Sequence, residues 1–224
     1  MLVFLAACAP AVIPPVTPGA DAGSFELVVL STTDQHGRIR GWDYYADTIE
    51  AGRGLSRLAT AVDSIRGANP GRVLLVDAGD LLQGNPFAYV AMKKFGGGAA
   101  NPIVAAMNTM RYDALAIGNH EYNYGVPYLE RAIGQARFPM LSANTLKPDG
   151  SHKFRPWVIV QRKGVKIGIV GATTPGVMVW DAENVKGRVQ LTDIIPAVRT
   201  AVDEVRAAGA NIVIVAVHAG LDEP

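Results

Sequence analysis

Cysteine is nearly absent from the sequence, and so is any excess of charge of one sign. The single cysteine among 224 residues is Cys8, so no disulfide framework holds the fold together. Lys and Arg number 21 and Asp and Glu number 20, whereas binding to a nucleic-acid backbone relies on clustered basic residues. This balance argues against duplex nucleic acid as a partner but leaves a nucleotide open as a substrate.

Long apolar runs are missing too. The apolar opening at residues 1–9 is shorter than the roughly 20 residues that span a bilayer, and it lacks the positive charges that begin an export signal. Within it, Leu5-Ala6-Ala7-Cys8 is similar to the lipobox of bacterial lipoproteins. We therefore expect export, to the periplasm or as a lipoprotein anchored through Cys8 and facing outside the cytoplasm. An ordinary signal peptide with an accidental cysteine is the alternative.

Apolar residues are abundant, at 49% of the chain against 18% charged residues. That composition is typical of a compact globular protein rather than a disordered one. Residues 1–23 are interpreted as a signal-peptide remnant followed by a proline-rich tether at residues 9–23, and residues 24–224 as one domain. In this domain strand-like apolar runs alternate with helical patterns, which predicts an α/β fold around a largely buried, partly parallel sheet.

Hydrophobic periodicity and capping residues place the remaining elements. Helices are expected at residues 55–65, from the Asn101-Pro102 cap, at 127–135, and from Thr192 with Ile195, Val198, Val202 and Val205 turned inward. Strands are expected at residues 140–143, 157–160 and 165–170, with a hairpin turn at Arg162-Lys163-Gly164.

Residue types that bind metal ions follow four of the apolar runs. Asp34 and His36 follow residues 27–30, Asp80 follows residues 73–76, Asn119 and His120 follow residues 114–117, and His218 follows residues 212–217. In parallel sheets, ligands gather beyond the carboxyl ends of the strands. We therefore predict that these side chains form one site.

The chemistry of these residues indicates hard or borderline metal ions. Carboxylate, imidazole and amide ligands without a thiolate favour Mn, Zn, Fe, Mg or Ca over soft copper. Asp34 and His36, two residues apart, would project to the same side of a strand leaving the sheet, and the carboxylate of Asp80 would bridge two ions. Two divalent ions about 3.5–4 Å apart would clamp the attacking and leaving oxygens of a phosphoryl displacement and supply hydroxide at neutral pH.

Each motif alone has an ordinary explanation. Asp-x-His pairs arise by chance, Gly-Asp at a strand end is usually a turn, and His218 alone is more often a buried, hydrogen-bonded histidine. Their occurrence together, in this order and each at a strand end, favours the metal site.

This series resembles the signature of the calcineurin-like metallophosphoesterases. The resemblance covers residues 26–224 and rests on Asp34-x-His36, Gly79-Asp80, Gly118-Asn119-His120-Glu121 and His218. It implies that residues 24–224 are a metallophosphoesterase domain, with a metallophosphoesterase-type α/β/β/α sandwich and mixed sheets. Finer features resemble one branch, the bacterial periplasmic 2′,3′-cyclic-nucleotide 2′-phosphodiesterase/3′-nucleotidases. These features are residues 43–47 (DYYAD), 79–84 (GDLLQG), 118–125 (GNHEYNYG) and 217–221 (VHAGL).

The resemblance also implies roles for individual residues. One metal ion would be held by Asp34, His36 and Asp80, and the second by Asp80, Asn119 and His218. His120 would not be a ligand; it would contact the phosphate and stabilise or protonate the leaving oxygen.

Several neighbouring residues carry weaker expectations. Related 5′-nucleotidases have an aspartate at the position of Asn123 that orients the catalytic histidine, so Asn123 favours the cyclic-nucleotide branch and leaves open what orients His120. Glu121 is interpreted as structural, and Asp77 either as a support for Asp80 or as an ordinary hydrogen-bonding group at a strand end. Four aromatic residues are interpreted as buried or capping rather than as base contacts: Trp42, Tyr44, Tyr45 and Trp180.

The implied activity is two-metal hydrolysis of nucleotides, first of 2′,3′-cyclic nucleotides to 3′-nucleotides and then of these to nucleosides. A 5′-nucleotidase or nucleotide-sugar hydrolase, and a non-catalytic surface-binding module, are the alternatives. The family pattern continues to a Gly-His-x-His motif, whereas this chain has only four histidines, at positions 36, 120, 152 and 218. We therefore expect a C-terminally incomplete domain that binds metal weakly and hydrolyses phosphodiesters poorly.

Overall fold

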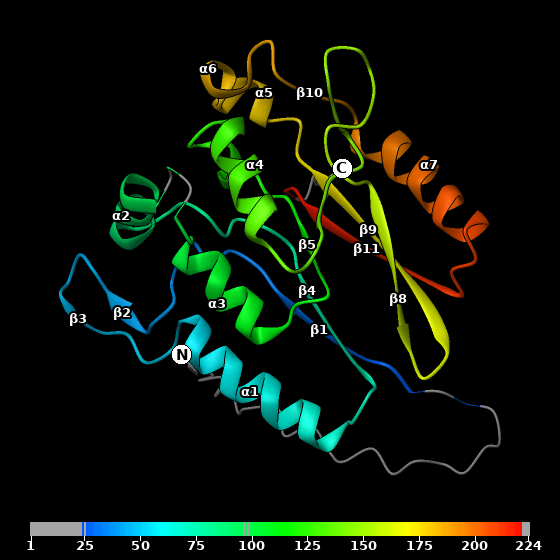
Figure 1. Ribbon diagram of the computed structural model, residues 1–224, viewed down its shortest axis with the longest axis horizontal. Coiled ribbons are helices and arrows are strands. Elements are labelled where there is room, and N and C mark those ends of the chain that lie inside the picture. The colour runs from blue at the N-terminus through cyan, green and yellow to red at the C-terminus, as the bar shows by residue number, and fades with distance from the viewer. Residues whose placement is uncertain (1–23, 25, 96, 98, 221–224) are drawn as a thin grey trace, which may run out of the picture.

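The computed structural model describes residues 24, 26–95, 97 and 99–220, which form four layers in the order helix, sheet, sheet, helix (Figure 1). The first sheet is parallel and has the strand order β1-β4-β5-β6. Its strands are β1 (Val28–Thr32), β4 (Val73–Asp77), β5 (Ala114–Ala116) and β6 (Met140–Leu141).

The second sheet is mixed and has the order β11-β9-β8. Its strands are β8 (Trp157–Arg162), β9 (Val165–Thr173) and β11 (Ile212–His218). Strand β11 runs parallel to β9, whereas β8 runs antiparallel to it and is joined to it by the expected turn at residues 163–164. The predicted α/β/β/α sandwich is confirmed, although only this second sheet is mixed within the described residues.

Helices cover the outer face of each sheet (Figure 1). The first sheet is covered by α1 (Leu55–Ala68), α2 (Pro86–Phe95), α3 (Pro102–Met110) and α4 (Val126–Gln135), and the second by α7 (Ile194–Ala207). The short helices are η1 (His120–Tyr122), α5 (Val177–Trp180) and α6 (Ala182–Val185). Two small ribbons pair β2 (Trp42–Asp43) with β3 (Thr48–Ile49), and β7 (Thr145–Leu146) with β10 (Gln190–Leu191).

Alternation along β4 shows why the layers stack. Leu75 packs into the core beneath the helices, whereas Leu74 and Val76 on either side of it face the second sheet and pack with Ile167 and Ile169 of β9. Since successive side chains of a strand point to opposite faces, a strand that is apolar throughout must be covered on both sides. Burying each such side chain contributes about 1.5–3 kcal/mol, which fixes the first sheet between its helices and the second sheet.

The first three predicted helices are confirmed as α1, α3 and α4, and the predicted cap of α3 is present. The fourth differs at its start: α7 begins at Ile194 rather than Thr192. The N–H of Thr192 donates to the carbonyl of Asn144 at 3.0 Å and so continues the extended path of β10. Ile195, expected to face inward, is 72% exposed.

The expectations for residues 1–23, including the lipid anchor on Cys8, lie outside the described residues and remain predictions. In the described part of the chain, no helix combines the length and the apolar character needed to cross a membrane.

Candidate metal centre

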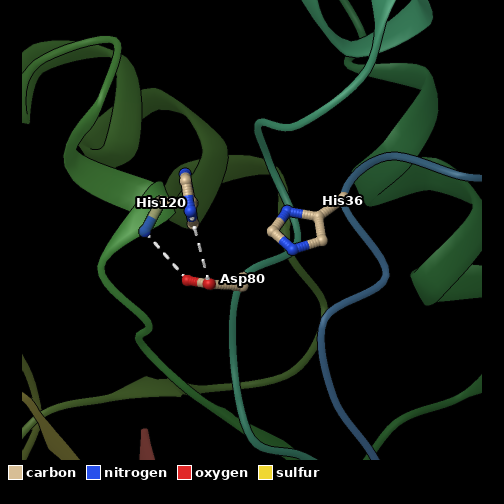
Figure 2. Close-up of side chains that lie close together, drawn as sticks. All are labelled: His36, Asp80 and His120. Atoms are coloured by element: carbon tan, nitrogen blue, oxygen red, sulfur yellow. Dashed lines mark hydrogen bonds and ion pairs between the residues drawn. The ribbon is translucent and has the colours of Figure 1, made fainter. Parts of the chain in front are cut away.

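The side chains predicted to bind metal converge at one edge of the sandwich. The ligand atoms of Asp34, Asp80 and His218 lie within 4.8 Å of one another, and so do those of His36, Asp80 and His120. Asp80 belongs to both groups and is only 3% exposed. Figure 2 shows His36 and His120 on either side of Asp80, whose carboxylate points toward His120. The loops after β1, β4 and β5 of the first sheet therefore meet the end of β11 from the second.

Backbone turns, and not strand alternation, bring Asp34 and His36 together. Strand β1 ends at Thr32, and the φ angles of Asp34, His36 and Asp80 are 54°, 48° and 61°. Non-glycine residues rarely adopt such left-handed angles, and where they do they often lie at functional sites. The N–H of Asp34 donates to Gly79 O at 2.9 Å and that of His36 to Asp80 O at 2.8 Å. These bonds hold the first loop against the second.

Two glycines allow the loops carrying Asp80 and His120 to touch. A Cβ on Gly79 would lie 2.6 Å from the backbone nitrogen of Gly118, and a Cβ on Gly118 would lie 2.3 Å from Asp80 Oδ1. Either side chain would push the loops apart. Where the two loops touch, the N–H of His120 donates to Asp80 Oδ1 at 2.8 Å. The sequence motifs Gly-Asp and Gly-Asn-His thus meet through their glycines.

Glu121 holds these two loops together through hydrogen bonds to their backbone. Its buried carboxylate accepts hydrogen bonds of 2.6–2.9 Å from the backbone N–H groups of Gly118, Asp80, Leu81 and Leu82. Burial raises the pKa of Glu121, with the nearby charge of Asp80 acting in the same direction and the backbone donors opposing it. With both oxygens occupied in this way, Glu121 has a structural role.

Hydrogen bonds to backbone carbonyls set the orientation of two of the histidines. The Nδ1 atom of His36 lies 2.6 Å from Gln83 O, and that of His218 lies 2.9 Å from Ala78 O. A carbonyl only accepts, so each Nδ1 carries the proton and donates. In the neutral form of each ring, Nε2 keeps its lone pair for the site, which is the arrangement common to metal-binding histidines.

The charges in the cluster are strongly coupled. The Nε2 atom of His218 lies 3.1 Å from Asp80 Oδ2. Burial acts to lower the pKa of His218, but the hydrogen bond and the charge of Asp80 outweigh it and raise that pKa to about 9. Burial likewise acts to raise the pKa of Asp80, yet the hydrogen bonds from His218 and His120 hold it below its usual range. A divalent cation would compete with the proton on His218, so metal binding would release it.

Two cavities adjoin Asp34. The larger, about 600 Å³, is lined by Asp34 and His36 together with the arginines Arg38, Arg53 and Arg57. The smaller, about 260 Å³, is lined by Asp34, Asn119, His218 and Trp180 among others. Asn119, the predicted amide ligand, therefore faces the same space as His218.

Three of the four aromatic residues interpreted as buried or capping are exposed. Tyr44 is 37% exposed, Tyr45 is 79% exposed and Trp180 is 66% exposed, so none of the three is buried. The Trp180 ring lies against Gly176, where a Cβ would be 2.5 Å from it, and it lines the smaller cavity. Tyr44 stacks on Phe87 with ring centroids 6.3 Å apart.

His120 is held by a residue whose role the sequence left open. Its Nδ1 atom lies 2.5 Å from Asn123 Oδ1, and the Asn123 amide in turn contacts Asp181. Asp181 follows α5, far from the motifs that carry the other site residues, so sequence reasoning gave it no role.

The residues present fit a divalent cation. Two carboxylates, an amide and imidazoles whose Nδ1 atoms are hydrogen-bonded to backbone carbonyls meet at the open edge of an α/β/β/α sandwich, and they offer the oxygen and nitrogen ligands that hard and borderline ions prefer. This fold and this set of ligand side chains are together typical of metal-dependent phosphoesterases.

Comparison with known proteins agrees with this class, although no family model matches the chain. The chain is 36% identical over 216 residues to the trifunctional nucleotide phosphoesterase protein YfkN of Bacillus subtilis, covering 90% of the chain and 15% of that protein. It is 38% identical to the 2′,3′-cyclic-nucleotide 2′-phosphodiesterase/3′-nucleotidase of Yersinia enterocolitica, covering 92% and 33%. It is 33% identical to the snake venom 5′-nucleotidase of Crotalus adamanteus, covering 90% and 34%.

A solved structure shows the same fold. The calcineurin-like phosphoesterase YfkN from Bacillus subtilis superposes with a TM-score of 0.82 at 37% identity, covering 88% of this chain and 63% of that one. The chain belongs to the calcineurin-like phosphoesterase family. It spans about a third or less of the length of the three relatives described above.

Proposed function

We propose that this chain carries the metal centre of a phosphoesterase that hydrolyses nucleotides. The preferred substrates are 2′,3′-cyclic nucleotides, opened to 3′-nucleotides that are then hydrolysed to nucleosides. The observation that supports this most directly is the shared position of Asp80 in two clusters of ligand atoms, since one carboxylate between two such clusters suits a pair of cations. The names of the relatives from Bacillus subtilis and Yersinia enterocolitica agree with a nucleotide substrate.

The residues divide between two divalent ions. Asp34, His36 and Asp80 would hold one ion, and Asp80, Asn119 and His218 the other. When bound, the ions would polarise the phosphoryl group and lower the pKa of the attacking water. Two distances support this division, since His36 Nε2 lies 3.6 Å from Asp34 Oδ1 and His218 Nε2 lies 3.1 Å from Asp80 Oδ2.

His120 has a different task. The Nε2 atom of His120 lies 3.8 Å from Asp80 Oδ2, compared with 3.1 Å for His218, and its side chain is 36% exposed compared with 14%. A more exposed imidazole at the mouth of the site is suited to meet a substrate rather than to be enclosed as a ligand. We therefore assign to His120 the contact with the phosphate and the transfer of a proton to the leaving oxygen.

A 5′-nucleotidase activity is the second candidate, because the relative from Crotalus adamanteus is a 5′-nucleotidase. Asn123 favours the cyclic-nucleotide activity, since 5′-nucleotidases carry an aspartate at its position. A binding module without turnover is the third candidate, and it differs from the first two in releasing no product.

Product analysis separates these candidates. With Mn²⁺ present, we expect slow release of adenosine from 2′,3′-cyclic AMP and from 3′-AMP but none from 5′-AMP. His120→Ala should lower kcat by roughly 10²–10⁴-fold, the usual contribution of an acid–base group. His152→Ala, in an exposed loop, is the matched control and should leave kcat unchanged. Equal release from 5′-AMP would favour the second candidate, and full activity of His120→Ala would refute the role given to His120.

A further inference from the structure

Asp181 is a buried carboxylate whose recorded side-chain partners are amides. It lies between α5 and α6 and is 7% exposed. Its oxygens accept from Asn123 Nδ2 at 2.9 and 3.0 Å and from Asn184 Nδ2 at 3.1 Å. Within the described residues, no Lys, Arg or His forms an ion pair with it. Burying a carboxylate costs free energy that these hydrogen bonds offset only in part. A neutral residue could make a purely structural contact at a smaller cost in folding free energy.

The carboxylate determines which way the Asn123 amide points. Both oxygens of Asp181 accept from Asn123 Nδ2. If the amide were turned over, its oxygen would face two carboxylate oxygens, and acceptor would meet acceptor. A second bond holds the loop itself, because Asn184 Nδ2 donates to the Asn123 carbonyl at 3.0 Å. The orientation of Asn123 is therefore fixed from two sides.

The fixed amide in turn determines the tautomer of His120. Asn123 Oδ1 lies 2.5 Å from His120 Nδ1 and can only accept, so Nδ1 must carry a proton and donate it. The other ring nitrogen, Nε2, then faces Asp80 at 3.8 Å. A flipped amide would offer N–H to Nδ1 and favour the opposite tautomer, with the proton on the nitrogen that faces the site.

We propose that Asp181 is a positioning residue, which acts through Asn123 to fix the ring orientation and the Nδ1–H tautomer of His120. Its catalytic importance rests on the proposed function, in which His120 serves the leaving oxygen. The hydrogen-bond chain itself does not depend on turnover. An aspartate–amide–histidine chain thereby takes the place of the direct carboxylate–histidine contact that the 5′-nucleotidase resemblance implied.

The tautomer of His120 can be read directly by two-bond ¹H–¹⁵N NMR correlations on the metal-free chain, at a pH at which the ring is neutral. The wild type is expected to show a single Nδ1–H form. Asp181→Asn removes the charge that orients Asn123 and is expected to give a mixture of the two tautomers. Asp203→Asn, on the exposed face of α7, is the matched control and should leave the His120 signals unchanged.

A double variant that exchanges the side chains at positions 123 and 181 tests the proposal even if Asp181→Asn alone impairs folding. Asn123→Asp combined with Asp181→Asn exchanges amide and carboxylate, so that the carboxylate now accepts directly from Nδ1 and the Nδ1–H form should return. Asn123→Asp alone brings two carboxylates together and should destabilise the chain. A pure Nδ1–H form in Asp181→Asn, or a mixture in the double variant, would overturn the proposal.

Kinetics then separate the inference from the proposed function. In a chain that turns over nucleotides, Asp181→Asn should lower kcat roughly 10-fold or more with little change in KM, and the double variant should recover most of the loss. A rise in KM with unchanged kcat would overturn the positioning role. The NMR result tests the hydrogen-bond chain, whereas product release from nucleotides tests the function, so each can fail alone.

Discussion

A single carboxyl group, that of Asp77, couples the stability of the loop beneath the site to pH. It is fully buried at the end of β4, where it accepts hydrogen bonds from Thr32 Oγ1 at 2.5 Å and from the N–H of Gly79 at 2.8 Å. Burial raises the pKa of Asp77 to about 7, although both hydrogen bonds act to lower it. The structure thus identifies Asp77 as a support for the turn that carries Asp80.

The raised pKa predicts how stability changes with pH. Because the folded state holds this proton more tightly than the unfolded state, its contribution is fully present below about pH 4 and is lost as pH rises through about 7. The loss is on the order of 4 kcal/mol, from about 1.4 kcal/mol per pKa unit. Asp77→Asn keeps an acceptor for Gly79 and removes the titration, so its unfolding free energy should vary less over this range.

Urea denaturation at a series of pH values measures this effect. Asp203→Asn serves as the control, because its exposed side chain should leave the slope of the wild type intact. An equally steep slope in Asp77→Asn would show that other groups cause the pH dependence.

The residues of the site could be predicted from the sequence more readily than the backbone geometry that brings them together. Asp34, Asp80 and His218 could be found because each follows an apolar strand, and parallel strands bring their carboxyl ends to one edge. The left-handed angles of Asp34 and His36 leave no comparable trace, since non-glycine residues rarely adopt them. Asp181 was missed because its partner Asn123 lies 58 residues away in the chain and no local pattern links the two.

Among the elements, α3 depends on a residue that does two things at once. Asn101 caps the helix by accepting from the N–H groups of Ile103 and Val104, and its Nδ2 donates to the hydroxyl of Tyr128 on α4 at 2.8 Å. It is buried, so water cannot replace either interaction. The cap thereby also joins two of the helices that cover the first sheet.

We expect Asn101→Ala to lower the free energy of unfolding by about 2–4 kcal/mol. Loss of a cap costs about 1 kcal/mol, and each buried polar group left without a partner adds about 1–3 kcal/mol. Asn101→Ser keeps a capping oxygen but loses the contact with Tyr128, so its loss should be smaller. Denaturant unfolding of the three proteins measures both steps, and equal losses in the two variants would show that the cap contributes little.

The elements that the sequence predicted well are those with a strong local signal. Helix α3 has an asparagine cap followed by proline, and α1 has a clear apolar stripe. Helix α2 was not predicted, although it begins with Pro86, a residue favoured in the first turn of a helix. The four-residue helices α5 and α6 are too short for periodicity to detect. Tertiary packing, and not local sequence, determines these segments.

At the scale of the whole molecule, the site joins the two sheets. Asp80 extends from the first sheet and His218 ends a strand of the second, and between the sheets lies an apolar core that includes Leu74 and Ile167. A cation bound by both residues would therefore link the two halves of the sandwich. Binding to the folded state alone would then stabilise the entire fold by mass action.

This linkage predicts a metal-dependent melting temperature. At a free Mn²⁺ concentration of about 100 times Kd, stabilisation should be about 2.7 kcal/mol, which for a chain of this length raises Tm by about 5–10 °C. His36→Ala removes one ligand and should reduce the shift, Asp80→Asn should nearly abolish it, and His152→Ala should retain it in full. Differential scanning calorimetry with Mn²⁺ and with a chelator measures all four proteins. The same shift in every variant would place the cation elsewhere, because only a site that includes Asp80 makes the stabilisation depend on that carboxylate.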